Sequence, residues 1–215
     1  MKTILLKDAA ALIPDGASVM IGGFMGVGTP ERLVDELVRQ GKRNLTVIAN
    51  DNAIPGIGIG KLISAGAVKR TIASHIGLNP ETQKKMLAGE LAVDLVPQGT
   101  LIERIRAGGF GLGGVLTPTG VGTVVEKGKQ RIEVEGKAYL LETALRADFA
   151  LVQAFLADYI GNLYYALTAR NFNPVIAMAA DTVIVEADNI VPVGVIAPDN
   201  VVTPAPVVDY IISHA

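Results

Sequence analysis

A glycine-rich segment that directly follows a short apolar run is the part of this chain best suited to chemistry. Val19, Met20 and Ile21 form the run, and glycines occupy positions 22, 23, 26 and 28. Glycine lets the backbone turn sharply and approach a ligand closely. Such a loop can present free N–H groups and the positive end of a helix dipole, which suit a phosphate or a developing oxyanion. The same residues also fit a tight strand–helix turn that binds nothing.

Two carboxamide side chains and one imidazole follow other apolar runs. Asn50 comes directly after residues 45–49, and Gln98 comes directly after residues 93–97. A carboxamide N–H can donate to a substrate carbonyl, although Asn and Gln also commonly cap loops and turns. His75 ends a further run and could act as a base, while a solvated or partner-bound loop histidine fits its position equally.

Composition narrows the classes of function. The chain has no cysteine and two histidines, His75 and His214, so the sequence predicts no metal site, no disulfide and no thiolate nucleophile. The net charge is −2 with both signs interspersed, which argues against nucleic acid as a partner. The uncharged residues 107–125 are interrupted by glycines, a proline and threonines, so they predict a loop system and no membrane span. We expect a cytoplasmic protein, because the apolar residues 4–6 are too few for a signal peptide.

Apolar runs alternate with segments of helical pattern along the chain. Strands are expected over residues 18–22, 45–49, 71–74, 93–97, 149–153 and 182–186. Helices are expected over residues 7–13, 29–40, 79–88 and 100–107. This alternation is typical of an α/β fold with an open, mostly parallel sheet flanked by helices, in which ligands bind beyond the C-terminal ends of the strands. The glycine loop, Asn50, His75 and Gln98 should therefore lie at one edge of the sheet.

Local signals predict where two helices begin and end. Thr29 is expected to cap the second helix, with Pro30 at its first position and Gly41 at its end. Thr100 and Glu103 have the spacing of a capping box, which would start the last of these helices at Thr100.

Residues 108–142 depart from the alternation. Residues 131–142 have the pattern of a β-hairpin that turns at Gly136-Lys137, so we expect a glycine-rich loop with a β-hairpin excursion. Residues 109–114 formally match the G-x-G-x-x-G fingerprint, but a helix precedes them and no helix follows, so no nicotinamide site is predicted. No linker divides the chain, and a single domain is expected over residues 1–215.

Several other blocks carry a resemblance to a known family. They are residues 48–52 (IANDN), 79–81 (NPE), 89–91 (GEL), 97–101 (PQGTL), 104–109 (RIRAGG), 117–123 (TPTGVGT), 170–174 (RNFNP) and 201–204 (VVTP). Together with the segment from Asp15 to Pro30, they resemble in order the A (α) subunit of family I coenzyme A transferases. The likeness runs from about Leu5 to about Ile212 and is greatest to α subunits acting on acetate, butyrate and acetoacetate, a 3-oxoacid; a succinyl-CoA-using member remains an alternative.

The resemblance implies a function and a set of site residues. Such enzymes move coenzyme A between an acyl-CoA, such as acetyl-CoA or succinyl-CoA, and a short-chain fatty acid or a 3-oxoacid such as acetoacetate. The matching family positions make Asn50 and Gln98 catalytic residues that bind the acyl group. The matching coenzyme A-binding segment comprises Phe24, Met25, Gly26, Val27, Gly28, Thr29 and Pro30. Coenzyme A is a substrate here, and no cofactor is expected.

The resemblance also implies a partner. In this family a glutamate in a Ser-Glu-Asn-Gly context attacks the thioester and becomes a glutamyl-CoA in a ping-pong reaction. That tetrapeptide is absent from this sequence, so the nucleophile is expected on a β subunit, in an α2β2 assembly. Two alternatives rest on a similar α/β scaffold: a sugar-phosphate isomerase, for which Asp51 is the nearby acid/base carboxylate, and a ligand-binding regulatory module.

Overall fold

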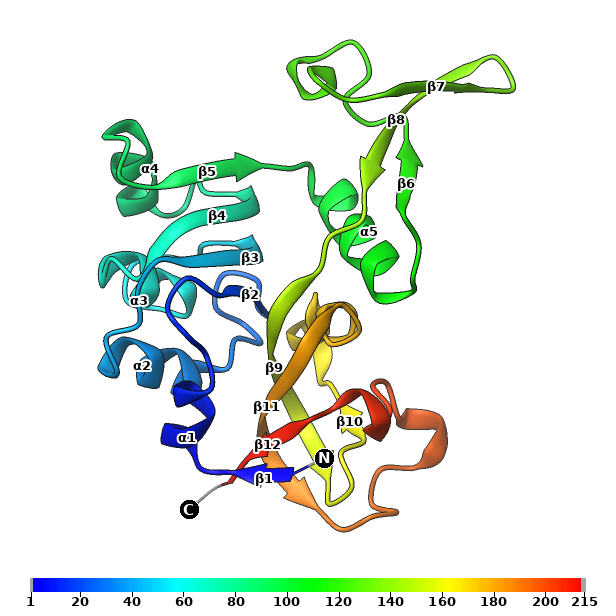
Figure 1. The fold of residues 1–215 in the computed structure, drawn as a ribbon. Coiled ribbons are helices and arrows are strands. Elements are labelled where there is room, and N and C mark those ends of the chain that lie inside the picture. The colour runs from blue at the N-terminus through cyan, green and yellow to red at the C-terminus, as the bar shows by residue number, and fades with distance from the viewer. Residues whose placement is uncertain (1, 214–215) are drawn as a thin grey trace.

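The structure is a computed structural model that describes residues 2–213, and His214 lies outside them. Figure 1 shows one long sheet with helices on both sides and a small second sheet that projects from the body. The strands are β1 (Lys2–Ile4), β2 (Ser18–Ile21), β3 (Leu45–Asp51), β4 (Val68–His75), β5 (Ala92–Leu95), β6 (Gly114–Thr117), β7 (Arg131–Val134), β8 (Lys137–Thr143), β9 (Ala147–Asp158), β10 (Leu163–Tyr164), β11 (Ala180–Val191) and β12 (Tyr210–Ile212). The α-helices are α1 (Leu6–Ala11), α2 (Glu31–Arg39), α3 (Ile59–Ser64), α4 (Pro80–Leu87), α5 (Gln98–Gly109) and α6 (Asn173–Ile176).

The large sheet has the strand order β1-β12-β11-β9-β2-β3-β4-β5, and its neighbouring strands run parallel. Only β10, which pairs with β9 off this path, is antiparallel within the part of the sheet that the structure describes. The expected α/β class and mostly parallel sheet are therefore confirmed. The six expected strands are all present, and the short strands β1, β10 and β12 were not predicted.

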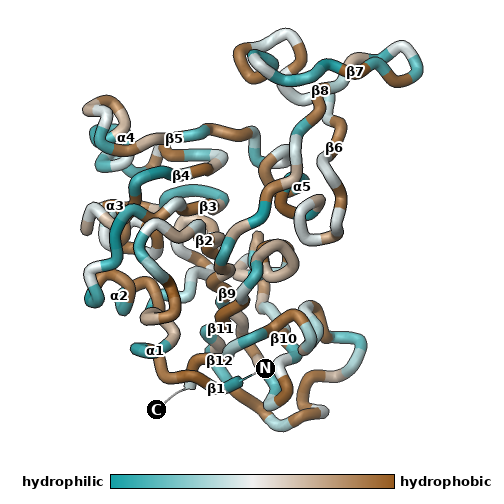
Figure 2. Tube along the Cα trace, in the orientation of Figure 1, coloured by the Kyte–Doolittle hydropathy of each residue, from teal (hydrophilic) through white to brown (hydrophobic). Residues whose placement is uncertain are grey.

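Successive side chains of the central strands alternate between two hydrophobic cores, one on each face of the sheet. Val19 and Ile21 of β2 belong to one core with residues of α1, α2 and α3, whereas Met20 belongs to the other with residues of α5 and α6. A strand buried on both faces reads as a continuous apolar run, which is the pattern that its sequence showed. Hydrophobic segments run through β9 and β11, and also through β12 near the lower edge of the sheet (Figure 2).

The excursion is an antiparallel sheet of order β6-β8-β7. The expected hairpin is present, but its two turn residues are Glu135 and Gly136, one position earlier than predicted. Both have positive φ values, 50° and 74°, which the two-residue turn between Val134 and Lys137 requires.

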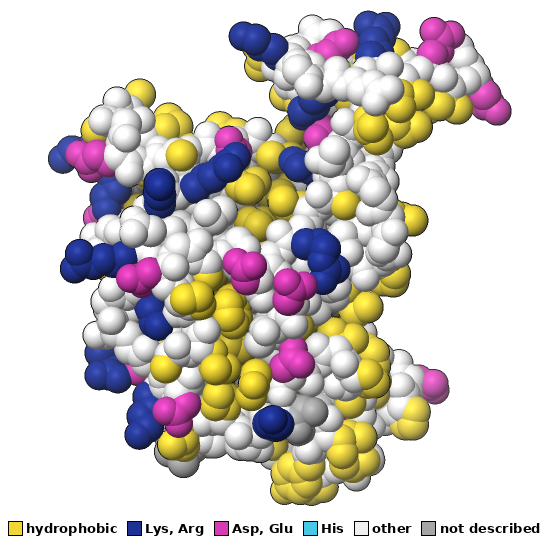
Figure 3. Space-filling model, in the orientation of Figure 1, with side chains coloured by type: hydrophobic (Ala, Val, Ile, Leu, Met, Phe, Trp, Pro, Cys, Tyr) yellow, Lys and Arg dark blue, Asp and Glu magenta, His cyan; other side chains and the backbone are white. Residues whose placement is uncertain are grey.

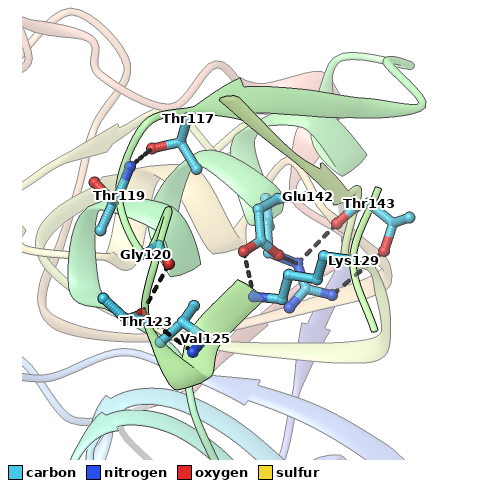
Figure 4. Close-up of polar contacts among 9 residues, drawn as sticks. Thr117, Thr119, Gly120, Thr123, Val125, Lys129, Glu142 and Thr143 are labelled. Atoms are coloured by element: carbon cyan, nitrogen blue, oxygen red, sulfur yellow. Dashed lines mark hydrogen bonds and ion pairs between the residues drawn. The ribbon is translucent and has the colours of Figure 1, made fainter. Parts of the chain in front are cut away.

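A buried carboxylate, Glu142, ties this excursion to the body (Figure 4). Glu142 is 2% exposed, accepts a hydrogen bond from Lys129 Nζ and lies 4.0 Å from Arg104 Nε of α5. The neighbouring loop is held by its own threonines, because Thr123 Oγ1 donates to the Gly120 carbonyl and accepts from Val125 N–H. The glycine-rich loop is thus an ordered part of the excursion.

Helix α5 starts earlier than its sequence suggested. Its first residue is Gln98, directly after Pro97, so Thr100 and Glu103 lie inside the helix and form no capping box. Proline presets the backbone at a helix start without needing a hydrogen bond from its own nitrogen. This places Gln98 at the rigid first position of a helix, where the sequence had suggested a loop.

Within residues 2–213, no helix combines the length and the apolar character that crossing a bilayer requires.

Candidate functional site

The C-terminal ends of β2, β3 and β4 and the start of α5 surround a small hollow of about 220 Å³. It is lined by Phe24, Met25, Asn50, Asp51, Ser74, His75, Leu78 and Gln98. The fold therefore brings together Asn50 and Gln98 with the first two residues of the expected coenzyme A-binding segment. Thr29 and Pro30 of that segment are buried and do not line the hollow.

The two expected carboxamides are hydrogen-bonded to each other. Gln98 Nε2 donates to Asn50 Oδ1 at 2.5 Å, and Asn50 is 1% exposed whereas Gln98 is exposed. Ser74 Oγ donates to the Asn50 carbonyl at 2.7 Å, which joins the ends of β3 and β4. Asn50 is therefore a buried support, and Gln98 is the member of the pair that can reach a ligand.

Asp51 joins this pair to the glycine loop. Its carboxylate accepts from Asn50 Nδ2 at 2.7 Å, from Ala53 N–H at 2.7 Å and from Met25 N–H at 3.1 and 3.2 Å. The isomerase alternative needs a free acid/base carboxylate at this point. Both Asp51 oxygens instead accept hydrogen bonds from the protein, so the structure gives that alternative no support.

The glycine loop forms a projecting turn. Phe24 N–H donates to the Val27 carbonyl at 3.0 Å, and Val27 N–H donates to the Phe24 carbonyl at 2.9 Å. The two residues between them, Met25 and Gly26, have φ values of 51° and 92°. The side chains of Phe24, Met25 and Val27 are about half exposed. The turn thus presents apolar side chains to its surroundings.

Few of the loop's N–H groups are free to bind an anion, which corrects the expectation from the sequence. Gly23 N–H donates to Asn171 Oδ1 and Met25 N–H to Asp51. Among the described residues, only Gly26 and Gly28 in the stretch 22–29 donate no backbone hydrogen bond. Up to two amides, rather than a ring of them, therefore remain for a substrate.

Two asparagines that the sequence reasoning did not select hold this loop in place. Asn173 is fully buried, and its Nδ2 donates to the carbonyls of Gly28 and Ala169 at 2.8 and 2.9 Å. A Cβ on Gly22 would lie 1.9 Å from Asn173 Oδ1, which explains the glycine there. Asn171 Nδ2 donates to the Val27 carbonyl at 2.9 Å. The only signal in the sequence was the block at residues 170–174 that resembles the family.

The N-terminus of α2 is occupied by a carboxylate of the protein itself. The cap residue is Pro30, and Thr29 makes no side-chain cap, contrary to expectation. Instead Glu186 of β11 accepts from Leu33 N–H at 2.8 Å and from Arg32 N–H at 3.2 Å. A negative side chain at a helix N-terminus satisfies the free N–H groups and the dipole. The end of α2 is therefore not available to a phosphate.

Burial raises the pKa of Glu186 above its ordinary value of 4.5, and the hydrogen bonds from Leu33 and Arg32 N–H oppose this shift only in part. The folded chain consequently binds this proton more tightly than the unfolded chain. This shift stabilises the folded chain. The stabilisation is fully present below the unfolded-state pKa of Glu186 and is lost as the pH rises through the raised folded-state pKa.

We therefore expect the free energy of unfolding of the wild type to fall relative to that of Glu186→Gln as the pH rises above the ordinary carboxyl pKa of 4.5. Urea unfolding of both proteins across that range measures the difference. Glu133→Gln, at an exposed position of β7, is the matched control and should show no such trend. Parallel pH profiles for the wild type and Glu186→Gln would contradict the prediction.

A second, larger hollow of about 590 Å³ lies against the same turn. It is lined by Phe24, Met25, Val27, Thr168 and Asn171. Because Phe24 and Met25 line both hollows, the turn divides a small hollow that contains the carboxamide pair from a larger one whose wall is mainly apolar. Two adjoining compartments of this kind can hold two different parts of one ligand.

This chain is similar over nearly its whole length to subunits of coenzyme A transferases. A family model described as coenzyme A transferase matches residues 3–214. The alpha subunit of acetate CoA-transferase from Escherichia coli K12 is 58% identical over 211 residues, which cover 98% of this chain and 96% of that protein. The acetoacetyl-CoA:acetate/butyrate CoA transferase alpha subunit of Clostridium acetobutylicum is 52% identical and covers 99% and 98% respectively. The A subunit of succinyl-CoA:3-ketoacid coenzyme A transferase from Xanthomonas campestris strain B100 is 45% identical, covering 96% and 85%.

Solved structures share the fold. The acyl-CoA transferase YdiF of E. coli O157:H7, in a thioester complex with CoA, aligns with a TM-score of 0.86 at 23% identity over 98% of this chain. This chain spans about half of the YdiF chain, 46% of its length. Glutaconate coenzyme A-transferase of Acidaminococcus fermentans aligns with a TM-score of 0.82 at 22% identity, covering 99% of this chain and 76% of that chain.

Proposed function

Since this chain belongs to the coenzyme A transferase family, we propose that it is the α subunit of an enzyme that moves coenzyme A between an acyl-CoA and a short-chain carboxylate. The acyl donor is acetyl-CoA or succinyl-CoA, and the acceptor is a short-chain fatty acid or a 3-oxoacid such as acetoacetate. The observation that carries this proposal is the small hollow, where the Gln98–Asn50 pair lies beside the glycine turn.

The chemistry requires a donor for developing charge. A glutamate carboxylate attacks the thioester carbonyl, and the carbonyl oxygen becomes an oxyanion in the tetrahedral intermediate. The thiolate leaves to give an acyl-glutamyl anhydride, then attacks the glutamyl carbonyl to give glutamyl-CoA and releases the first carboxylate. The acceptor carboxylate reverses these steps. Gln98 has a second Nε2–H beyond the one given to Asn50, and we assign it to the oxyanion.

The turn at Phe24–Val27 separates the two ends of the substrate in this proposal. The small hollow of about 220 Å³ suits a short acyl group, and the larger apolar hollow suits the pantetheine arm. The proposed coenzyme A-binding segment then has two kinds of residue, those that contact the ligand and those that support the loop. The segment comprises Phe24, Met25, Gly26, Val27, Gly28, Thr29 and Pro30. Phe24, Met25 and Val27 contact the ligand, while the buried Thr29 and Pro30 hold the loop.

A β subunit supplies the nucleophile in the proposed enzyme. The three relatives named above are described as alpha or A subunits, and this chain has no Ser-Glu-Asn-Gly tetrapeptide. Apolar side chains are also exposed just after the C-terminal ends of β9 and β11, at Tyr159, Ile160, Val193 and Val195. Figure 3 shows hydrophobic side chains gathered at this lower end of the molecule. Exposed apolar surface of this kind fits a chain with a permanent partner in an α2β2 assembly.

The proposed reaction uses coenzyme A as a substrate and no cofactor or metal, because the glutamate and the hydrogen-bond donors supply each step. The cytoplasmic location stays a prediction from the sequence.

The test is an assay of this chain co-purified with its β subunit. We expect coenzyme A transfer from acetyl-CoA to butyrate and to acetoacetate, and succinyl-CoA is tested as the alternative donor. Chromatography of the acyl-CoA products measures the transfer. Transfer should show ping-pong kinetics. Hydrolysis of the donor without transfer to any acid of this panel would contradict the proposal.

A further inference from the structure

We propose that His75 recognises the 3-oxo group of the acyl chain and thereby favours 3-oxoacids over simple fatty acids as substrates. The inference rests on the proposed function and adds a specificity residue to it. Its basis is the position of the His75 imidazole, its fixed orientation and the donors that remain free around the small hollow.

His75 lies next to the carboxamide pair. It is the last residue of β4, and the strand register places it opposite Asp51 of β3. Neighbouring strands of a sheet are about 4.8 Å apart. The preceding residue, Ser74, bonds to Asn50, and His75 itself lines the small hollow with Gln98. An acyl group whose first carbonyl meets Gln98 therefore occupies the same hollow of about 220 Å³ that His75 lines.

The orientation of the ring is set by the turn that follows it. Gly77 N–H donates to His75 Nδ1 at 3.0 Å, so the neutral ring carries its proton on Nε2. A Cβ on Gly77 would lie 2.6 Å from Cε1 of the ring, and the absence of a side chain there makes room for the imidazole. The turn is held in place by Gln83 of α4, whose Nε2 donates to the Gly77 carbonyl at 3.0 Å.

The other polar side chains of the hollow are already engaged. Asp51 accepts from three groups of the protein, and Ser74 Oγ donates to Asn50. Asn50 is buried beneath Gln98. Among the side chains that line the hollow, the accessible N–H donors are therefore those of Gln98 and His75 Nε2. The remaining wall is apolar, from Phe24, Met25 and Leu78.

Two accessible donors, in a hollow whose other polar side chains are already hydrogen-bonded, match an acyl chain with two carbonyl groups. In an acetoacetyl group the thioester carbonyl and the 3-oxo carbonyl are separated by one methylene. Gln98 donates a hydrogen bond to the thioester carbonyl and His75 Nε2–H donates to the 3-oxo carbonyl, while the methyl group contacts the apolar wall. Acetyl and butyryl groups have no second oxygen and do not use His75. A site that donates a hydrogen bond to a substrate oxygen discriminates against analogues that lack it.

The experiment compares two acceptors in the α–β complex with acetyl-CoA as the donor. His75→Phe keeps an aromatic ring and removes the donor, and we expect it to lower kcat/KM for acetoacetate about tenfold through KM, with kcat/KM for butyrate nearly unchanged. Gly77→Ala should produce the same selective loss, because its Cβ displaces the imidazole without removing it.

Equal losses for both acids would show that His75 has only a structural role and would overturn the inference, as would unchanged acetoacetate kinetics in both variants. If His75→Phe fails to assemble with the β subunit, the result with Gly77→Ala decides. A wild-type complex that transfers coenzyme A to butyrate but not to acetoacetate would contradict this inference alone. A wild-type complex that transfers to neither acid would contradict the proposed function as well.

Discussion

This chain purified without a partner is expected to transfer no coenzyme A, and addition of the β subunit is expected to restore transfer. The reason is that the described residues lining the small hollow include no free carboxylate. Its one carboxylate, Asp51, is 7% exposed and accepts hydrogen bonds from Met25, Asn50 and Ala53. A carboxylate engaged in this way positions the loop and cannot attack a thioester.

The measurement is the transfer activity of this chain by itself, of the isolated β subunit, and of the two mixed. Mass spectrometry of peptides after incubation with acyl-CoA locates the covalent intermediate, which should be a glutamyl-CoA on the β subunit. Turnover by this chain without its partner, or a coenzyme A-modified glutamate in its own peptides, would refute the division of the site between two chains.

Gln98→Ala in the complex is expected to lower kcat about 10²- to 10³-fold, which is the usual effect of removing one donor to an oxyanion. Gln98 is the exposed member of the carboxamide pair and the first residue of α5. Alanine is the best helix former, so the helix should keep its start at this position. Asn50 Oδ1 retains its contact with Ser74 Oγ at 3.4 Å. The loss should therefore fall on turnover and not on folding or assembly.

Gln130→Ala is the matched control, because Gln130 is an exposed glutamine outside helices and strands that does not line the small hollow. Its kcat should equal that of the wild type. Steady-state kinetics with acetyl-CoA as donor, together with size-exclusion chromatography of each complex, separate catalysis from assembly. A Gln98→Ala complex of normal size with normal kcat would remove Gln98 from the catalytic set.

The expected elements were largely found because their signals are local. The runs at 18–22 and 45–49 read as buried strands and form β2 and β3. The helix expected over residues 79–88 is α4, and Asn79 caps it by accepting a hydrogen bond from Thr82 N–H at 3.0 Å. The helix starts at Thr29 and Thr100 were wrong, because a polar residue near a helix start is a cap only when the backbone places it there. At these positions Pro30 and Pro97 take the cap position.

The sequence by itself determined the α/β class, the family and the edge of the sheet at which the candidate residues meet. These depend on periodicity, order of blocks and the common direction of parallel strands. Only the tertiary structure decided that Glu186 occupies the N-terminus of α2 and that Asn171 and Asn173 hold the glycine turn. Each pairs groups more than 140 residues apart, and the hydrogen bonds form only after the sheet has brought those segments together. Local sequence patterns therefore cannot predict these contacts.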